Sequence, residues 1–335
     1  MRAFVITGPA RGGVQDVPPP EARPGEVVVD VERVGVCGTD VELFGGEMSY
    51  QHTGQALYPL RIGHEWCGVV GAVGEGVDPS WLGRRVTGDT MLGCGHCDRC
   101  AAGRHHVCAE RHEIGIRGGR PGALAERLPV PVTALHSLPD SVDPVLGALV
   151  EPGANALRAV RGAALEKGER LLVLGPGTIG LLAAQIAAAQ GAEVHLLGNT
   201  EPSLAFARSA GFPHVWTRET LPSLRWDAVV DASNAPGLPA LAADLVEPGR
   251  RVVYIGLSSG PSLADTRALV LKDVTAVGVL SGSGALAETI ALYAAGTVDP
   301  RPLVAGTVPL AETAAVLSGH RPSGGGPKIH VDPHR

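Results

Sequence analysis

Four cysteines lie close enough along the chain to bind a single metal ion. Their spacing is C-x2-C-x2-C-x7-C, formed by Cys94, Cys97, Cys100 and Cys108. Zinc accepts four thiolates in a tetrahedral arrangement, and a site with four protein ligands keeps no open position for a substrate. Glycines among the cysteines permit the tight turns that bring the sulfurs together. The spacing therefore predicts a structural zinc; the alternatives are an iron–sulfur cluster or four cysteines without a metal.

Cys37 and His64 are candidates for a second metal site. Cys37 lies in the run V-C-G-T-D, and His64 lies in the run G-H-E. A single cysteine or histidine is most often a packing residue, so these residue types alone leave that alternative open. A thiolate, an imidazole and a carboxylate on one zinc ion would leave a coordination position free for a substrate.

A glycine-rich run marks a candidate cofactor site. The apolar run Arg170–Leu174 is followed by G-P-G-T-I-G at residues 175–180 and then by the apolar segment Leu181–Gln190. In such a strand–turn–helix order the glycines allow close backbone approach, and the helix N-terminus offers unpaired N–H groups to a pyrophosphate. We expect a dinucleotide to contact Gly175, Gly177, Thr178 and Ile179. The alternative is an ordinary tight turn.

The elements that must position these residues fall into two groups. Residues 1–149 carry short β-type runs separated by glycine and proline, which is typical of a partly open β-barrel. These runs are Glu26–Val34, Cys67–Val73, Arg85–Thr87 and Ala125–Val130. Beyond Glu151 strands alternate with helices, which predicts an α/β domain with a doubly wound parallel (Rossmann) sheet. Its predicted strands are Arg170–Leu174, Glu193–Leu197, Ala228–Asp231, Arg251–Ile255 and Val274–Val279.

The C-terminal part of the chain is expected to return to the first domain. A helix at Ala285–Ala295 and a β-like segment at Lys328–Val331 follow the last alternating strand, with a turn at Ser323–Pro327 between them. We therefore expect a catalytic domain made of residues 1–152 and 286–335, and a dinucleotide-binding domain made of residues 153–285.

Composition narrows the class of protein. The chain of 335 residues is 44% hydrophobic and 19% charged, with a formal net charge of −6 and no long basic run, so nucleic acid is not an expected partner. No apolar run approaches the ~20 residues that a membrane-spanning helix needs. Met1–Val5 begins a strand-like run without the features of a secretory signal. We expect a cytoplasmic protein without a membrane partner.

The metal motifs together resemble those of a known family. Residues 63–77 read G-H-E-x2-G-x5-G-x2-V, which is similar at every fixed position to the signature of zinc-containing alcohol dehydrogenases. With the C-G-T-D run upstream and the four cysteines downstream, the chain resembles the zinc-dependent medium-chain alcohol dehydrogenases, in particular their polyol (sorbitol) and glucose dehydrogenase-like branch. The resemblance extends over essentially the whole chain. It implies a chaperonin-10-like, partly open β-barrel catalytic domain beside the Rossmann domain, in a homodimer or homotetramer.

The resemblance also implies roles for individual residues. Cys37 and His64 would bind a catalytic zinc, with Glu65 or water completing its coordination and Glu151 as an acidic ligand or water-holding carboxylate. The metal would act as a Lewis acid that helps an alcohol to ionise before hydride transfer. Asp40 would hydrogen-bond the zinc-bound histidine and fix its tautomer. Thr39 would pass the substrate proton outward.

The proton relay departs from the family pattern. Where the family usually has a histidine after C-G-[ST]-D-x, this chain has Glu42. Three roles are open for Glu42: it carries the proton, it contacts substrate or cofactor, or it is a solvated surface acid. His52 is a substitute candidate for the relay, and the alternative for it is an ordinary loop histidine.

The second strand of the dinucleotide domain bears on the choice of cofactor. It ends in Gly198, Asn199 and Thr200, where an NAD enzyme usually has an acidic residue for the ribose 2′-hydroxyl. A glycine there removes a charge that would repel a 2′-phosphate, and Arg218 could supply a cation. We therefore favour NADP(H) over NAD(H). We expect residues at the ends of the later strands to lie near the nicotinamide. The alternative is that they are ordinary buried strand ends. These residues are Ile255, Leu257, Leu280 and Ser281.

The substrate hypothesis comes from the same branch of the family. The insertion Phe44–Pro59 and the motif C-G-T-D-x-E are similar to those of glucose dehydrogenases, and they suggest substrate contacts at Glu42, Glu113 and Asn155. A pocket rich in carboxylates and amides suits a sugar, cyclitol or polyol. The alternatives are a dehydrogenase of simple secondary alcohols and ketones, a zinc-free enone or quinone reductase, and a non-catalytic scaffold. The apolar strand Val274–Val279 could pair with a second subunit.

Overall fold

The computed structural model describes residues 1–258, 260–322 and 325–335. Its contacts divide the chain into two compact units, Met1–Glu151 with Leu286–Arg335 (unit 1) and Pro152–Ala285 (unit 2). The first boundary lies one residue before the one expected from the sequence. Two residues of the turn expected at Ser323–Pro327 lie outside the described residues.

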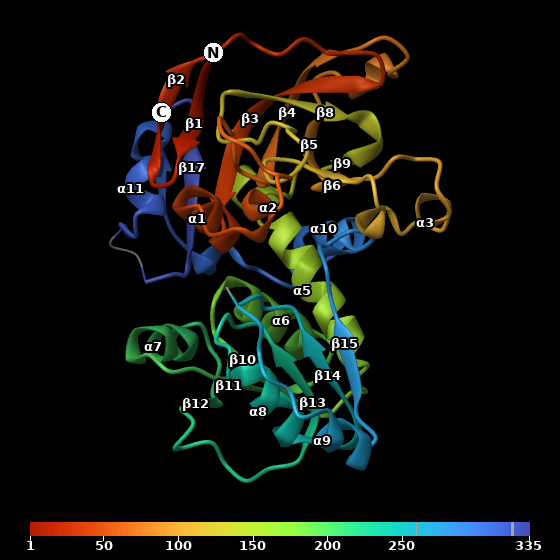
Figure 1. Ribbon diagram of the computed structural model, residues 1–335, viewed down its shortest axis with the longest axis vertical. Coiled ribbons are helices and arrows are strands. Elements are labelled where there is room, and N and C mark those ends of the chain that lie inside the picture. The colour runs from red at the N-terminus through yellow and green to blue at the C-terminus, as the bar shows by residue number, and fades with distance from the viewer. Residues whose placement is uncertain (259, 323–324) are drawn as a thin grey trace. The chain divides into compact units, whose positions relative to one another are not determined.

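Unit 1 is built on a mostly antiparallel sheet of seven strands (Figure 1). The order is β16 (Val304–Pro309), β17 (Lys328–Asp332), β3 (Glu26–Val36), β4 (Glu65–Val73), β5 (Arg85–Gly88) and β9 (Leu135–Ser137), with β8 (Arg127–Pro131) also paired to β3. Two strand pairs complete the unit: β1 (Arg2–Gly8) with β2 (Arg11–Asp16), and β6 (Met91–Leu92) with β7 (His112–Glu113). This sheet fits the partly open β-barrel expected for the first domain.

The long central strand β3 organises unit 1. It contacts β17, β4 and β8, and its valines alternate into the core as the period of two in a strand requires. Val27, Val29 and Val31 are fully buried and share one core cluster with Trp66 of β4. Because β3 and β4 are antiparallel with Gly35 opposite Glu65, the end of β3 lies beside the start of β4. This register brings the segment after Val36 to the segment before Glu65.

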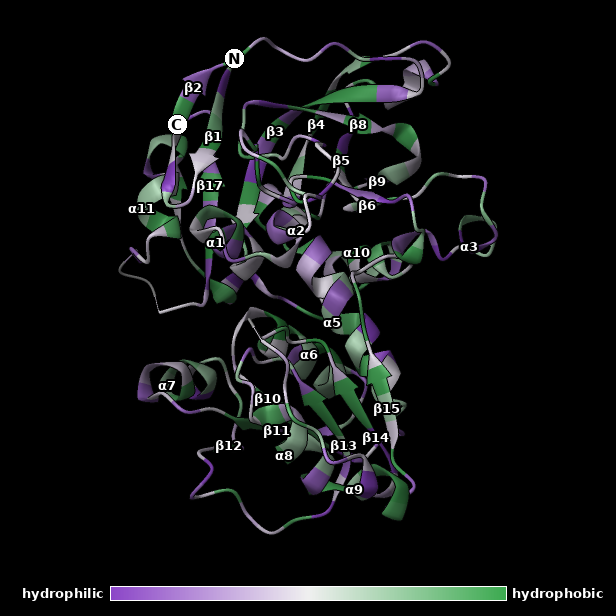
Figure 2. Ribbon diagram, in the orientation of Figure 1, coloured by the Kyte–Doolittle hydropathy of each residue, from purple (hydrophilic) through white to green (hydrophobic). Residues whose placement is uncertain are grey.

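Unit 2 holds the predicted parallel sheet. Its six strands are ordered β12 (Val215–Trp216), β11 (Glu193–Leu197), β10 (Arg170–Leu174), β13 (Trp226–Asp231), β14 (Val246–Tyr254) and β15 (Thr275–Gly278), and every pair is parallel. This is the doubly wound order expected of a Rossmann domain. Figure 2 shows the central strands β13 and β14 as hydrophobic along much of their length, because a parallel sheet is covered on both faces. The bounds predicted for β10 and β11 match the structure.

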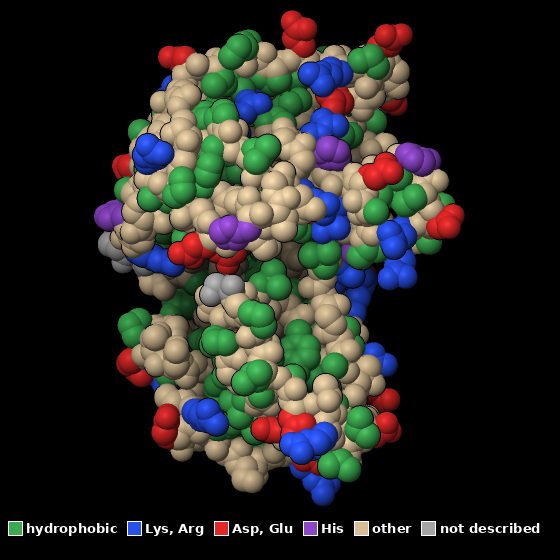
Figure 3. Space-filling view, viewed as in Figure 1, with side chains coloured by type: hydrophobic (Ala, Val, Ile, Leu, Met, Phe, Trp, Pro, Cys, Tyr) green, Lys and Arg blue, Asp and Glu red, His purple; other side chains and the backbone are tan. Residues whose placement is uncertain are grey.

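Helices connect these strands. Unit 1 contains α1 (Gly38–Gly45), α2 (Ser49–His52), α3 (Asp98–Ala101), α4 (Pro144–Ala148), α10 (Leu286–Ala294) and α11 (Thr313–Leu317), and α5 (Val150–Ala163) starts in unit 1 and continues in unit 2. Unit 2 contains α6 (Thr178–Ala189), α7 (Glu201–Ser209), α8 (Leu238–Leu245) and α9 (Thr266–Leu271). Within the described residues, none of these helices has the length and apolar character needed to span a bilayer. On the face drawn in Figure 3, basic and acidic side chains are intermingled on both units.

Candidate metal centres and cofactor site

A thiol, an imidazole and a carboxylate converge at the end of β3. Cys37 follows β3 directly and is the N-cap residue of α1, His64 precedes β4, and Glu65 is its first residue. Their ligand atoms lie within 4.8 Å of one another. His64 and Glu65 are buried, and Cys37 is half-buried. This set of donors suits zinc, and it comes from two segments that the β3–β4 register brings together.

Asp40 holds both of these segments in place. Its side chain is fully buried; Oδ2 accepts a hydrogen bond from the Cys37 N–H at 2.9 Å, and Oδ1 accepts one from the Gly63 N–H at 3.1 Å. His64 Nδ1 lies 3.4 Å from Asp40 Oδ1, an ion-pair distance without hydrogen-bond alignment. Burial by itself lowers the pKa of His64, but Asp40 and the Cys37 thiol raise it well above its ordinary value. With Nδ1 facing a carboxylate, Nε2 is the nitrogen left for a metal.

Lys328 is a site residue that the sequence analysis missed. Its ammonium group donates hydrogen bonds to Oε1 and Oε2 of Glu65 at 2.8 and 2.6 Å, and a third to the Val36 carbonyl at 3.0 Å. Lys328 lies on β17, which was expected as a strand, and neighbours β3 in the sheet. The one local signal was the rarity of lysine, because Lys328 is one of only three lysines in the chain.

The other residues expected near the catalytic metal lie at the margins of this set. Thr39 is half-buried in the first turn of α1, and Glu42 is half-buried one turn further along the same helix. Burial, and next the nearby Glu47 carboxylate, raise the pKa of Glu42. Glu151 is buried in the first turn of α5, outside the group of ligand atoms found among the described residues. His52 is exposed at the end of α2.

Glu113 is engaged by other side chains of unit 1. Its Oε1 atom accepts hydrogen bonds from Arg111 Nε at 2.8 Å and from the Tyr50 hydroxyl at 3.1 Å. Arg111 Nη2 also donates to the Tyr50 hydroxyl, and Arg117 lies over the Tyr50 ring. Glu113 is only 3% exposed, so its carboxylate is part of a closed network. Asn155, the third expected substrate residue, is half-buried on α5 in unit 2.

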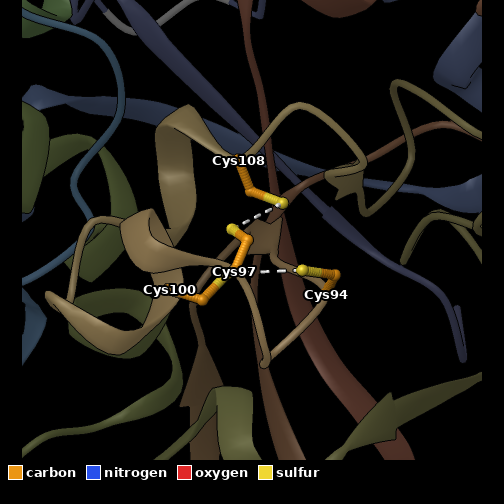
Figure 4. A group of neighbouring side chains, drawn as sticks. All are labelled: Cys94, Cys97, Cys100 and Cys108. Carbon is orange, nitrogen blue, oxygen red and sulfur yellow. Dashed lines mark hydrogen bonds between the residues drawn. The ribbon is translucent and has the colours of Figure 1, made fainter.

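The four clustered cysteines converge in one loop of unit 1 (Figure 4). The Sγ atoms of Cys94 and Cys100 lie 3.9 Å apart, and those of Cys97 and Cys108 lie 3.8 Å apart. Four sulfurs at ~2.3 Å from a tetrahedral zinc ion would be about 3.8 Å from one another. All four cysteines are free of disulfides. The arrangement therefore matches a closed, structural zinc site.

A buried aspartate anchors this loop to the barrel. Asp89 follows β5; its Oδ1 atom accepts a hydrogen bond from the Met91 N–H, and its Oδ2 atom lies 2.8 Å from His105 Nε2. His105 also packs against Gly93, where a side chain would clash with it. The pair links the segment before Cys94 to the segment before Cys108. The sequence analysis did not single out either member.

The glycine-rich run of unit 2 turns between β10 and α6. Gly175 has a φ of 92°, a left-handed conformation that favours glycine. A Cβ atom at Gly180 would lie 2.0 Å from the Gly175 carbonyl oxygen, so only glycine permits this close approach. Gly177 is the N-cap of α6 and makes no side-chain cap, which leaves the N–H groups of Thr178 and Ile179 at the helix start. These are the features that a pyrophosphate needs.

The strand register brings the expected ribose residues near one another. Strands β11 and β12 are parallel, with Leu197 opposite Trp216. Asn199 lies two residues after Leu197, and Arg218 lies two residues after Trp216. Both are exposed. Gly198 is buried against Pro176, where a side chain would clash. Thr200 is exposed as the N-cap residue of α7.

The later strand ends differ in exposure. Ile255 follows β14 and is half-buried, whereas Leu257 is 69% exposed. Leu280 follows β15 and is 37% exposed. Ser281 is buried with a φ of 64°, and its hydroxyl donates to Ser283 Oγ at 2.9 Å.

Comparison with known proteins decides the family. Residues 23–140 match the alcohol dehydrogenase GroES-like domain, and residues 178–295 match the zinc-binding dehydrogenase domain. The chain is 33% identical over 306 residues to a 2-dehydro-3-deoxy-L-galactonate 5-dehydrogenase of Pseudoalteromonas atlantica, covering 88% of this chain and 87% of the relative. The chain belongs to the zinc-dependent medium-chain alcohol dehydrogenases.

Further relatives of this dehydrogenase vary in substrate and cofactor. An L-threonine 3-dehydrogenase of Deinococcus deserti is 32% identical over 276 residues, covering 79% of each chain. An Escherichia coli alcohol dehydrogenase complexed with NADH has a TM-score of 0.91 at 25% identity, covering 99% of each chain. A putative zinc-binding dehydrogenase of Sinorhizobium meliloti bound to NADP has a TM-score of 0.90 at 27% identity, also covering 99% of each chain. The family is one of oxidoreductases, and these relatives differ in both their substrates and their cofactors.

Proposed function

We propose that this enzyme transfers a hydride between the secondary alcohol or ketone of a sugar, cyclitol or polyol and NADP(H), with one catalytic and one structural zinc per chain. The observation that carries the proposal is the convergence of the half-buried Cys37 and the buried His64 around Asp40. Zinc at such a site supplies Lewis-acid chemistry that makes a hydroxyl proton more acidic.

The chain's own residues would prepare this site in distinct ways. Asp40 orients the His64 ring, so that Nε2 faces away from the carboxylate. Lys328 neutralises Glu65, which leaves Cys37 and His64 as the uncommitted donors of the set. Thr39 and Glu42 lie on α1 next to Cys37 and are our candidates for moving the substrate proton. Glu151 is our candidate for a further carboxylate ligand.

The substrate class is supported by relatives. One relative carries the name of a sugar-acid dehydrogenase, and another that of an L-threonine 3-dehydrogenase. Both names describe oxidation of a hydroxyl in a polar molecule. The second candidate is a simple secondary alcohol or ketone. Glu113 accepts hydrogen bonds from Arg111 and Tyr50, so its carboxylate is already engaged. Any role of Glu113 in substrate binding would therefore be to shape the wall of the substrate pocket.

The cofactor preference rests on charge. No acidic residue occupies positions 198–200, and Arg218 follows the neighbouring strand in register. A guanidinium there suits a 2′-phosphate. Structures with NADH and with NADP both occur among the relatives, so this preference depends on the residues of this chain.

A second copy of the chain is the partner we propose for the edge of the unit 2 sheet. Strand β15 is the last strand in the sheet order and has exposed residues along it. The preceding helix α9 exposes Val270 and Leu271 at 79% and 86%. Edge-to-edge pairing would cover both, and a mass measurement in solution distinguishes dimer, tetramer and monomer.

The experiment that tests the function combines metal analysis with turnover. The wild-type enzyme should contain two zinc ions per chain, and C37A and H64A should each contain one and lose activity by at least about 1000-fold. C67A removes a buried thiol outside both sites and is the matched control. A panel of polyols, sugar acids, L-threonine and aliphatic alcohols then assigns the substrate class. Full activity in C37A and H64A would refute the mechanism, and activity confined to aliphatic alcohols would refute the polyol proposal.

A further inference from the structure

A cavity in unit 1 is lined by arginines rather than by metal ligands. It has a volume of about 490 Å³, and its walls include Arg23, Arg61 and Arg120. Prolines from three segments form rigid apolar walls, among them Pro19, Pro121 and Pro129. Among the described residues, neither the Cys37 set nor the cysteine loop contributes to this lining. The volume is in the range of small-molecule sites.

The charges of the cavity do not cancel. Arg120 Nη1 donates to Glu26 Oε1 at 2.6 Å, so this pair is neutral. Arg23 and Glu21 line the cavity as exposed residues. Arg61 is half-buried, and the described residues provide its guanidinium with no hydrogen bond or ion pair. The cavity therefore has one excess positive charge, on the half-buried Arg61.

The backbone around Arg61 is firmly held in the fold of unit 1. Leu60 and Ile62 on either side are buried in the core of unit 1. The Leu60 N–H and carbonyl bond to Ile6, the Arg61 carbonyl accepts from the Gly122 N–H at 2.9 Å, and the Ile62 carbonyl accepts from Leu124. These bonds fix the backbone on both sides of Arg61, whose side chain lines the cavity. Burial lowers the pKa of Arg61, as expected for a cation without a partner.

We propose that this cavity binds a small organic anion, with Arg61 as the group that holds its oxyanion. A guanidinium presents paired N–H donors that match a carboxylate or phosphate group. The proline walls would contact the apolar part of the ligand, and the Arg120–Glu26 pair would border it. The site is separate from the catalytic centre and does not depend on the proposed function.

The test follows Arg61 and its surroundings by NMR in the full-length, metal-loaded protein. The side-chain Nε–Hε signal that disappears in R61K identifies Arg61, and the amide signal of Gly119 reports on the cavity lining. Titration with succinate, and separately with inorganic phosphate, should shift both signals along a saturable curve. A saturable response to succinate alone assigns a carboxylate ligand, and one to phosphate alone assigns a phosphate ester.

Variants separate the site from general attraction of anions. R61Q should weaken binding by at least about tenfold at the Gly119 signal, and R61K should also weaken it, because a lysine keeps the charge and loses the paired donors. R127Q, which changes an exposed arginine on β8 paired with Asp30, is the matched control. C37A should bind the anion as wild type does, whatever its activity. Linear shifts of equal size at Arg61 and Arg127, or equal affinity in R61Q, R61K and wild type, would overturn the proposal.

Discussion

Lys328 and Glu65 form a buried ion pair although 263 residues separate them along the chain. The lysine is 2% exposed and the glutamate 1%, and the ammonium contacts both carboxylate oxygens. The pair is possible because β17 and β4 lie on either side of β3. A carboxylate adjoining His64 is thereby neutralised from the opposite strand, so that its availability to a metal depends on Lys328.

Replacing Lys328 should destabilise the fold. In K328M the Glu65 carboxylate stays buried without its cation, and we expect the free energy of unfolding to fall by about 3–5 kcal/mol. Urea denaturation of the metal-loaded protein measures this loss. The double variant E65Q/K328M removes both charges and should recover most of the stability. A K328M protein as stable as wild type would show that the pair contributes nothing.

Asp40 should control the metal through His64. In D40N an amide group would have to face two backbone N–H donors and the imidazole at once, so one contact becomes unfavourable. We expect metal affinity or kcat to fall by about 10- to 100-fold. Zinc competition with a chelator and steady-state kinetics measure the two effects. D140N, at an exposed aspartate, should behave as wild type.

The cysteine loop should lose its metal and its order when one ligand is removed. In C97S we expect one zinc ion per chain in place of two, with faster proteolysis between residues 93 and 111, because metal binding supplies the folding free energy of such sites. Metal analysis and limited proteolysis check both points. C67A should keep two zinc ions. Two zinc ions in C97S would contradict the assignment of Cys97 as a ligand.

His330 should make stability depend on pH. It lies on β17, is fully buried, and the described residues offer neither ring nitrogen a hydrogen bond. Burial, and next Lys328 and Arg33, lower its pKa to about 3. As pH falls, the unfolded chain takes up a proton at this histidine before the folded protein does. The contribution of His330 to the free energy of unfolding is therefore fully present above an ordinary histidine pKa of about 6.5, and it declines as pH falls toward the pKa of the folded state.

The expected size of this effect is about 2 kcal/mol between about pH 7 and about pH 5. Urea denaturation at several pH values should show that H330L lacks this part of the slope. H52L, at an exposed histidine, should keep the wild-type slope. Identical slopes in H330L and wild type would mean that His330 is not the group responsible.

Arg218 should determine the affinity for the phosphorylated cofactor. We expect R218A to raise KM for NADP(H) by about tenfold and to change KM for NAD(H) little, because only the former carries a 2′-phosphate. R208A, at an exposed arginine of α7 paired with Glu201, is the matched control. A wild-type enzyme that prefers NAD(H) would refute the cofactor proposal before any variant is made.

The sequence alone predicted those features that depend on short stretches of consecutive residues. The bounds of β10 and β11 were predictable because each strand is a largely apolar run that begins after a turn and ends just before a glycine. The cysteine spacing and the G-P-G-T-I-G run were recognisable because ligand loops and phosphate loops are built from consecutive residues. The family followed from these motifs, since each carries its own chemistry.

Only the tertiary structure decided which charges meet. Glu113 was expected to face a substrate, yet in the fold it accepts hydrogen bonds from Arg111 and Tyr50. The local sequence did not show that Lys328 pairs with Glu65 or that Arg61 lines a cavity, because the sheet register and the barrel wall determine which residues become their neighbours. Whether a buried charge finds a partner depends on contacts between distant segments, and spacing along the chain does not encode them.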